Sequence, residues 1–546
     1  MRIPKRAVGG MLAVATVAIV LANQQQVGLA RDEIVYMQSG ARYADWWIAV
    51  GQQTSGAGGS ALSTDRIAST FGGPNATDNN REHPPLMKTL FGLSHRVLHG
   101  LLGVDEVTAF RVPSALLHGL LVLLVFAMVL ELWGFSEAVV SALLVMFLPR
   151  AVFHAGLACF DAPTMTLWFA TVYAYWRCLD GRKWPWQVGA VFGLALATKH
   201  TALLLPFALG LHYVIAGVRE RGLARALAFR WRVIVSLVVV APLTLGLVWP
   251  WLWLDPVGHV KDWLAFHLEH VNYHFEYLGT NWSAPPFPWH VALVTTLFTV
   301  PAATLAAGAI GVAAWIARCR AHADRAGMPG VLLALSAAAS IAPFLFGSTP
   351  IFGAEKHWMP ALPSLCIAGG VGAVWAARTL AALVPHGRIR YATCGAVCAA
   401  VVGAAVIETI AAQPYALTWY NAIVGGAPGG ADRGMNRQFW GVAARGVLPV
   451  LRGDAGTARH PVYSHDASPA WGFYIKRGDL PSTLADSGHE ALGIANSHYA
   501  LVIHERHFNR HDYLIWNAYG TVQPMFVLRA AGVPIVTVYK RPNVRE

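Results

Sequence analysis

The chain has 546 residues, of which 55% are hydrophobic and 13% charged, and its mean hydropathy is +0.45. Soluble globular proteins carry about 25% charged residues, so this composition excludes an ordinary soluble enzyme. The net charge of +12 does not indicate a nucleic-acid-binding protein, because the Lys and Arg residues are concentrated in short segments between apolar runs. We therefore expect a polytopic membrane protein that binds no nucleic acid.

About eleven apolar stretches are long enough to cross a hydrocarbon core of roughly 30 Å as helices. In chain order they are residues 7–27, 108–132, 136–152, 161–178, 186–199, 200–217, 232–254, 289–317, 328–347, 358–381 and 391–411. Lys199-His200 divides one long apolar region, which leaves open a short or re-entrant helix there. A secretory signal peptide is the alternative for the first stretch, but the later spans favour a first transmembrane helix.

The basic segments between these stretches predict the topology. Residues 177–183, 219–232, 318–325 and 378–390 fall on one side if the N-terminus is cytoplasmic, as the positive-inside rule requires. The outer face then carries loops 28–107, 255–288 and 348–357 and the tail from about residue 412. We expect residues 1–411 to form a membrane domain, in which the first outer loop 28–107 carries the catalytic motif, and residues 412–546 to form an extracytoplasmic domain.

The tail and the first outer loop differ in their local patterns. Pro461–His465, Tyr499–His504 and Pro534–Lys540 predict short buried strands, so the tail is expected to be a small α/β domain. In the loop, residues 51–80 are rich in Gly, Ser, Thr and Asn and predict a flexible segment, while 83–103 have helical periodicity. All six cysteines lie in or beside apolar runs, which implies no disulfide framework.

Charged residues recur at the predicted outer membrane boundary. Asp32 and Glu33 follow the first span, where a carboxylate is costly to desolvate unless it has a task or a partner, although solvated helix caps are the simpler alternative. His83 to Lys88 form a Pro-containing joint between loop and helix. Arg111 and Asp161 stand at the starts of the second and fourth spans. These charges share one predicted compartment.

Two further groups are candidates for chemistry. Lys199 lies between apolar stretches, where a charge marks a functional site or merely snorkels to the interface. The spacing of His267, His270 and His274 would align three imidazoles on one helical face. Hydrogen bonding at the interface is favoured over a metal site there, because the sequence specifies no fourth ligand.

Taken together and in this order, these segments resemble glycosyltransferase family 39, the protein O-mannosyltransferases and their bacterial relatives, which adjoin the aminoarabinose transferases in the GT-C superfamily. The matching segments are the acidic pair Asp32-Glu33, the HPPLxK stretch His83–Lys88, Arg111 with Ser114-Ala115, Asp161-Ala-Pro163, Gly193–Lys199, Lys356–Pro363 and Tyr420–Gly426. The chain departs from the eukaryotic mannosyltransferases because it has only the short segment 348–357 where they have a large outer domain. That departure puts protein mannosylation in doubt.

The resemblance implies a GT-C fold in the bacterial inner membrane, with a periplasmic catalytic face, a polyprenyl-phosphate sugar as donor and inversion at the anomeric carbon. Asp32 is expected to be the general base, with Glu33 orienting the acceptor or neighbouring cations, and the reverse assignment of the pair is the alternative. The expected ligands of the donor phosphate are Arg111, Lys199, Lys88 and Lys356, and the other expected substrate-binding residues are His83, Asp161, His357 and His270. No metal or other cofactor is expected to be obligatory.

The acceptor is expected to be a hydroxyl or phosphate of a glycan, lipid or protein, and membrane lipids are the expected surroundings. Two other classes compete with this interpretation. A secondary transporter or lipid flippase would also have intramembrane charges, but the sequence has no inverted repeat. A scaffold protein with a degenerate site would tolerate the loss of Asp32.

Overall fold

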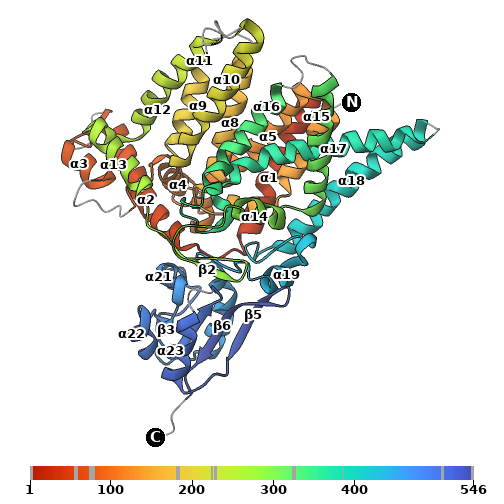
Figure 1. Cartoon of the computed structure of the whole chain (residues 1–546). Helices are drawn as coiled ribbons and strands as arrows, with labels where there is room; N and C mark the ends of the chain where they lie inside the picture. Colours follow the sequence, from red (N-terminus) through yellow and green to blue (C-terminus); the bar gives the residue numbers. More distant parts are fainter. Residues whose placement is uncertain are drawn as a thin grey trace.

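The structure is a computed structural model of the whole chain, and it describes residues 4–54, 60–72, 80–179, 185–222, 226, 230–321, 328–384, 387–505 and 509–542. A bundle of apolar helices makes up most of the molecule, and the C-terminal residues form a smaller domain at one end (Figure 1). We call this the domain end of the bundle. The expected polytopic α-helical fold with a small C-terminal α/β domain is confirmed.

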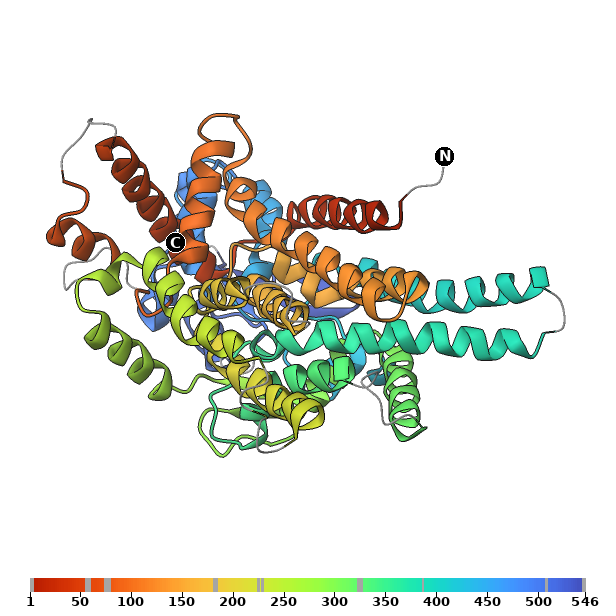
Figure 2. The same ribbon diagram turned by 90° about the horizontal axis from the view of Figure 1, so that it is seen from above.

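The apolar segments form helices because they combine length with few charges. They are α1 (Lys5–Gln24), α5 (Glu106–Leu132), α6 (Phe135–Met146), α7 (Pro149–Ala155), α8 (Asp161–Cys178), α9 (Trp186–Leu196), α10 (Leu205–Arg221), α11 (Trp231–Val235), α12 (Ala241–Val248), α14 (Val291–Thr299), α15 (Ala302–Ala321), α16 (Met328–Ile341), α17 (Leu362–Ala382) and α18 (Gly387–Ala412). Each of the expected apolar stretches falls on one or two of these helices. Figure 2 shows α17 and α18 projecting together beyond the rest of the bundle.

Fewer of these helices than expected satisfy the criteria for a complete span. Within the described part of the chain, eight helices are long and apolar enough to cross a membrane, or nine if α6 and α7, which meet at 65°, are one broken span. The difference lies in short or charged segments. Helix α9 has only 11 residues, and α8 begins with Asp161 and contains Arg177 near its end.

Helices outside the bundle gather at the domain end. They are α2 (Arg31–Thr54), α3 (Thr64–Phe71), α4 (Leu86–Leu98) and α13 (Pro256–Leu268). Helix α4 agrees with the periodicity of residues 83–103. Of the segment 51–80, for which flexibility was expected, residues 64–71 form α3, while 55–59 and 73–79 lie outside the described residues.

The location of the acidic pair differs from expectation. Asp32 and Glu33 are not the end of the first span but the first turn of α2, because residues 25–30 leave α1 and a new helix begins at Arg31. Carboxylates in a first turn interact favourably with the helix dipole. On this turn the two side chains point in different directions, so Asp32 and Glu33 have different surroundings.

The C-terminal domain contains a four-stranded sheet of order β3-β4-β6-β5, formed by β3 (Val462–Tyr463), β4 (Tyr499–Ile503), β6 (Val533–Lys540) and β5 (Phe526–Ala530). Strands β3 and β4 are parallel, whereas β4–β6 and β6–β5 are antiparallel, with Leu501 opposite Val538. The helices of this part of the chain are α19 (Gly426–Asp432), α20 (Leu448–Asp454), α21 (Ser468–Lys476), α22 (Glu490–Ala495) and α23 (Asn509–Tyr519). Three strands agree with expectation, and β5 was not anticipated.

The C-terminal domain is joined to the bundle by a shared core. One apolar cluster includes Val27 and Leu29 from the α1–α2 linker together with Trp471 and Tyr499 from the domain. At Gly28 the linker approaches the domain so closely that a Cβ atom would lie 2.0 Å from the carbonyl oxygen of Val442. A side chain at residue 28 would therefore separate the two parts.

A short hairpin lies between the bundle and the domain (Figure 1). Strands β1 (Phe275–Tyr277) and β2 (Thr280–Trp282) are joined by Leu278 and Gly279, whose φ angles of 48° and 78° are those of a type I′ turn. Gly279 N–H donates to the carbonyl of Gly434 at 3.0 Å. The hairpin and the loop before it thereby form one side of the space beneath the domain.

Candidate active site

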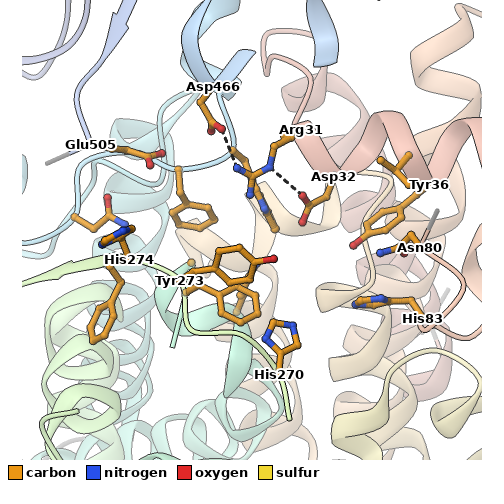
Figure 3. Close-up of a pocket in the computed structure, with 18 of the residues that line it drawn as sticks. Arg31, Asp32, Tyr36, Asn80, His83, His270, Tyr273, His274, Asp466 and Glu505 are labelled. Atoms are coloured by element: carbon orange, nitrogen blue, oxygen red, sulfur yellow. Dashed lines mark hydrogen bonds and ion pairs between the residues drawn. The ribbon is translucent and has the colours of Figure 1, made fainter. Parts of the chain in front are cut away.

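A cavity of about 250 Å³ lies where the domain end of the bundle meets the C-terminal domain (Figure 3). Its walls come from the start of α2, residues 80–83, the chain after α13, residues 352–356, residues 436–440 and the C-terminal domain. The acidic, basic and histidine side chains that line it are Arg31, Asp32, Glu82, His83, His270, His274, Glu276, Lys356, Asp466 and Glu505. Of the expected site residues, Asp32, His83, His270 and Lys356 therefore line one cavity.

Asp32 presents its carboxylate at the wall of this cavity. Its side chain retains 28% of its exposure, and Oδ1 lies 3.4 Å from Nε of Arg31. Arg31 also donates from Nη1 to Oδ1 of Asp466 at 2.8 Å, so the guanidinium connects α2 to the C-terminal domain (Figure 3). The carboxylate of Asp32 keeps oxygen lone pairs available on the cavity side.

Glu33, the next residue, is completely buried and points away from the cavity. Its carboxylate accepts two hydrogen bonds from Arg111, both at 2.8 Å, and one each from the N–H groups of Ala30 at 2.9 Å and Ala158 at 2.7 Å. A buried carboxylate is stable only with such compensation. Glu33 is thus occupied by structural contacts.

The guanidinium of Arg111 also has a complete set of hydrogen-bond partners. Besides Glu33, it donates to the carbonyls of Gln24 at 3.0 Å, Val27 at 3.2 Å and Gly28 at 2.7 Å, and its side chain is 1% exposed. The guanidinium therefore holds the α1–α2 linker against α5. This arrangement does not match the expectation that Arg111 binds the donor phosphate, because its N–H groups already have acceptors and it does not line the cavity.

Lys356 has the opposite environment. Its Nζ lies 4.3 Å from the ring centre of Trp440, 4.7 Å from that of Phe352 and 5.9 Å from that of Phe439. Across the described ranges, no carboxylate lies within ion-pair distance of this Nζ. Burial lowers the pKa of Lys356, more than the neighbouring charges of Asp32 and Asp161 raise it. An ammonium held only by aromatic faces is available to an anion that enters the cavity.

Two other expected phosphate ligands have partners of their own. Lys199 Nζ forms a buried ion pair with Asp161 at 2.6 Å, and neither residue lines the cavity. Lys88 is completely buried and donates to the carbonyl of Asn80 at 2.6 Å. Lys88 therefore fixes the segment that carries Asn80 and Glu82, both of which line the cavity.

The expected histidines fall into two environments. His83 lies 3.5 Å from Oε1 of Glu82, and burial lowers its pKa more than that carboxylate raises it. His357 does not line the cavity; its Nε2 contacts the carbonyl of Phe352, and burial lowers its pKa well below the usual value. Both rings are consequently suited to be neutral hydrogen-bonding groups.

The expected alignment of His267, His270 and His274 on one helical face is wrong. Helix α13 ends at Leu268, so only His267 is helical, and the chain then turns toward the β1–β2 hairpin. His267 Nε2 lies 3.3 Å from the carbonyl of Glu82, whereas the ring of His270 stacks on Phe352 at 5.2 Å. In the described part of the chain, no three His, Cys, Asp or Glu side chains are placed to hold a metal ion.

A buried charged network was missed by sequence reasoning. Arg150 Nη1 lies 2.5 Å from Oε2 of Glu355, and Nη2 donates to the carbonyls of Leu417 and Trp419. His154 lies 3.7 Å from Glu355 and 4.0 Å from Asp161. The network supports the loop that carries Lys356. A charge inside the apolar stretch 136–152 was the available signal for Arg150.

The C-terminal domain supplies Asp466 and Glu505, which were also missed. Burial raises the pKa of Glu505 well above its usual value, and the nearby charge of Asp466 adds to this effect. Burial likewise raises the pKa of Asp466 more than Arg31 lowers it. These two residues lie in a polar part of the sequence where a charge has no special significance, so only the folded chain reveals their location.

Comparisons with known proteins concern the sequence family and the fold. Residues 82–249 match the family model described as dolichyl-phosphate-mannose-protein mannosyltransferase. Apo ArnT from Cupriavidus metallidurans has a similar structure with a TM-score of 0.50 and 13% identity over 97% of both chains. No curated protein sequence matches.

Two further structures are similar at lower scores. ArnT from Cupriavidus metallidurans bound to undecaprenyl phosphate gives a TM-score of 0.46 and 15% identity over 97% of both chains. The Archaeoglobus fulgidus oligosaccharyltransferase in complex with Zn and sulfate gives 0.49 and 11% identity, over 94% of this chain and 70% of that one. The family resemblance inferred from the motifs is confirmed for residues 82–249, which match the dolichyl-phosphate-mannose-protein mannosyltransferase model, and the chain has a fold similar to that of ArnT.

Proposed function

We propose that this integral membrane protein is an inverting glycosyltransferase that moves a sugar from a polyprenyl-phosphate donor to an acceptor hydroxyl or phosphate. The observation that carries the proposal is one cavity at the domain end of the bundle into which both the Asp32 carboxylate and the Lys356 ammonium face. The name of the matching family supports the class of donor, because dolichyl phosphate mannose is a sugar on a polyprenyl phosphate.

Lys356 is the proposed ligand of the donor phosphate. As the bond between the anomeric carbon and the phosphate oxygen breaks, both electrons stay on that oxygen, and a cation 4–5 Å above the Trp440 and Phe352 rings can approach it. The second pKa of a phosphate monoester is about 6, so the leaving group needs little general acid at neutral pH. Lys199, Lys88 and Arg111 are assigned supporting roles, because each already has a protein partner.

Asp32 is the proposed general base. The acceptor oxygen attacks the anomeric carbon from the face opposite the phosphate, its proton passes to the Asp32 carboxylate, and polyprenyl phosphate departs. One displacement of this kind inverts the anomeric centre. Glu33 acts through the backbone: its bonds to Ala30 and Arg111 fix the first turn of α2 and with it the position of Asp32.

The proposed site of action is the periplasmic face of a bacterial inner membrane. The supporting observation is the series of basic segments 177–183, 219–232, 318–325 and 378–390, which the positive-inside rule assigns to the cytoplasm. The membrane domain 1–411 then carries the catalytic machinery, and the domain 412–546 covers it from outside. A glycan, a lipid or a protein can supply the acceptor.

The proposal is tested by substituting Asp32→Asn in purified protein reconstituted into nanodiscs. The substrates are a panel of polyprenyl-phosphate sugars that includes the mannose donor, together with an envelope extract as the source of acceptor, and the release of polyprenyl phosphate is measured. We expect Asp32→Asn to lower the rate by at least about 10²-fold while donor binding survives. The matched control is Asp45→Asn on the same helix, where Asp45 is 49% exposed and pairs with Arg96.

Two results would contradict the proposal. Turnover of Asp32→Asn at the parent rate would remove Asp32 as the base. Absence of any released polyprenyl phosphate from the parent protein across the donor panel would remove the transferase function itself.

A further inference from the structure

A second cavity, of about 170 Å³, lies near the first one but shares no lining residue with it in the described part of the chain. Its lining includes Gln24, Val27 and Leu29 from the end of α1 and the linker, whereas the first cavity begins at Arg31. The Glu33–Arg111 pair holds this linker in place between α1 and α2. The second cavity is therefore a separate site.

The second cavity lies at the boundary of the membrane. Helix α1, which is long and apolar enough to span the bilayer, ends at Gln24, and α5, a second such helix, begins at Glu106. Side chains from both ends, Gln24 and Thr108, meet in the cavity wall through a hydrogen bond of 2.9 Å. Apolar Val27 and Val107 line the same cavity, so it combines an apolar wall with polar groups, as the junction of lipid headgroup and acyl chain does.

The C-terminal domain contributes two arginines to this cavity. The side chain of Arg445 makes no hydrogen bond or ion pair with any described residue, although it is half-buried. Arg445 lies close to the α1–α2 linker at Gly28. A Cβ atom on residue 28 would be only 3.0 Å from Cβ of Arg445, so the absence of a side chain there allows Arg445 its position. An unpaired guanidinium in a cavity at the membrane boundary is available to an anionic ligand.

Arg477 is the second of these arginines. It is shared between Asp105 at 3.1 Å and Asp479 at 3.3 Å, and Asp105 also accepts from the N–H of Thr108 at 2.9 Å. Asp105 is therefore already paired, and its negative charge is compensated. The guanidinium of Arg445 remains the uncompensated charge of the cavity, since Arg111 is neutralised by Glu33.

We infer that this cavity binds the phosphate headgroup of an anionic membrane phospholipid, with Arg445 as its principal ligand and Arg477 as a second donor. A guanidinium can donate two parallel hydrogen bonds to one phosphate, and basic groups at a membrane surface attract anionic lipids. Because Arg445 belongs to the C-terminal domain while Gln24 and Thr108 belong to membrane helices, the bound lipid joins the two parts. It keeps the domain over the first cavity.

Binding of native-like lipids is the direct test. The protein is transferred from nanodiscs of phosphatidylcholine containing a minor share of phosphatidylglycerol, and bound phosphatidylglycerol is counted by native mass spectrometry over a range of lipid concentrations. We expect Arg445→Gln to bind phosphatidylglycerol about tenfold more weakly than the parent, because one charge-assisted pair is lost. The matched control is Arg452→Gln, an exposed arginine of helix α20 in the same domain.

Each alternative outcome is decisive. Equal phosphatidylglycerol binding by Arg445→Gln and the parent, or equal binding of phosphatidylcholine and phosphatidylglycerol by the parent, would overturn the inference. Competition by undecaprenyl phosphate or by inorganic phosphate with greater affinity than phosphatidylglycerol would assign the cavity to those ligands instead. If Arg445→Gln fails to fold, Arg445→Lys decides the question, since it keeps the charge and should retain part of the binding. Asp32→Asn should bind phosphatidylglycerol as the parent does, which separates this result from the fate of the proposed transferase.

Discussion

Asp32 and Glu33 are neighbours in the sequence but lie in opposite surroundings. The Glu33 region is closed: Arg111 and two backbone N–H groups occupy its carboxylate, and the guanidinium of Arg111 is used completely by protein acceptors. The Asp32 region is open, since a carboxylate and the ammonium of Lys356 face a cavity without pairing with each other. A buried charge with a complete set of partners is costly to leave unpaired, whereas incompletely compensated charges at a cavity are available to a ligand.

Breaking the closed region should have the largest effect. Arg111→Met leaves Glu33 buried without its counter-charge, which should reduce the free energy of unfolding by about 3–5 kcal/mol. Unfolding of the detergent-solubilised protein measures it. The control is Arg96→Met, an exposed pair partner of Asp45, which should cost at most about 1 kcal/mol. Adding Glu33→Gln to Arg111→Met should restore much of the loss, and an Arg111→Met protein as stable as the parent would show that the pair is not structural.

Breaking the open region should affect the ligand and not the fold. Lys356→Met removes the cation expected to bind the donor phosphate, so the affinity for polyprenyl-phosphate sugar should fall about tenfold while the unfolding temperature changes little. Equilibrium binding in detergent measures this affinity. Lys261→Met on α13, where the side chain is exposed, is the control. Unchanged donor affinity in Lys356→Met would show that another cation binds the phosphate, and Arg31, which also lines the cavity, is the next candidate.

The pH dependence of stability provides a finer test at the edge of the cavity. Burial, and next the charge of His83, lower the pKa of His267 to about 3. Between pH 6.5 and 3 the unfolded chain therefore binds a proton at His267 that the folded chain does not, so stability falls as the pH falls through this window. His267→Asn should make the unfolding temperature less sensitive to pH between 7 and 4, whereas substitution of the exposed His489 should leave the profile unchanged. An identical profile for His267→Asn and the parent would contradict the burial of this ring.

The smallest expected effect is that of chelation. If Lys356 is the cation that stabilises the departing phosphate, turnover should be the same with and without EDTA. The rate of polyprenyl phosphate release measures this directly. Loss of turnover with EDTA, restored by a single divalent metal and abolished again by His270→Ala, would give the histidines at the cavity a catalytic role.

Prediction from the sequence succeeded where a local pattern carries the information. Apolar length predicted the positions of the membrane helices, and the short apolar run Pro534–Lys540 predicted the buried strand β6. Strand β5 was missed because its residues are only partly buried and its short apolar run is interrupted by Arg529. Helix α2 was missed because it is amphipathic with a mean hydropathy near that of a loop, so its polar first turn was interpreted as the end of a span.

The site residues also divide into those that a sequence motif reveals and those that only the folded chain reveals. Asp32, His83 and Lys356 stand in motifs with a recognisable order, so they could be found without a structure. The pairing of Glu33 with Arg111 could not, because it joins residues 78 positions apart and depends on which face of the α2 turn each side chain occupies. Asp466 and Glu505 depend on the docking of a separate domain, which leaves no trace in the sequence around them.

Because α17 and α18 project together from the bundle, we expect their orientation to depend on the thickness of the bilayer. Helix α18 has 26 residues, so it is about 39 Å long, whereas the hydrocarbon core is roughly 30 Å thick. A helix that is longer than the hydrocarbon core either tilts or thickens the bilayer around it. Few residues of α18 are buried inside the protein, so this helix is largely exposed to lipid. Since α17 follows directly after the segment that carries Lys356, a change in the tilt of α17 moves that segment. Membranes with longer or shorter acyl chains would thereby adjust the depth at which the cavity opens.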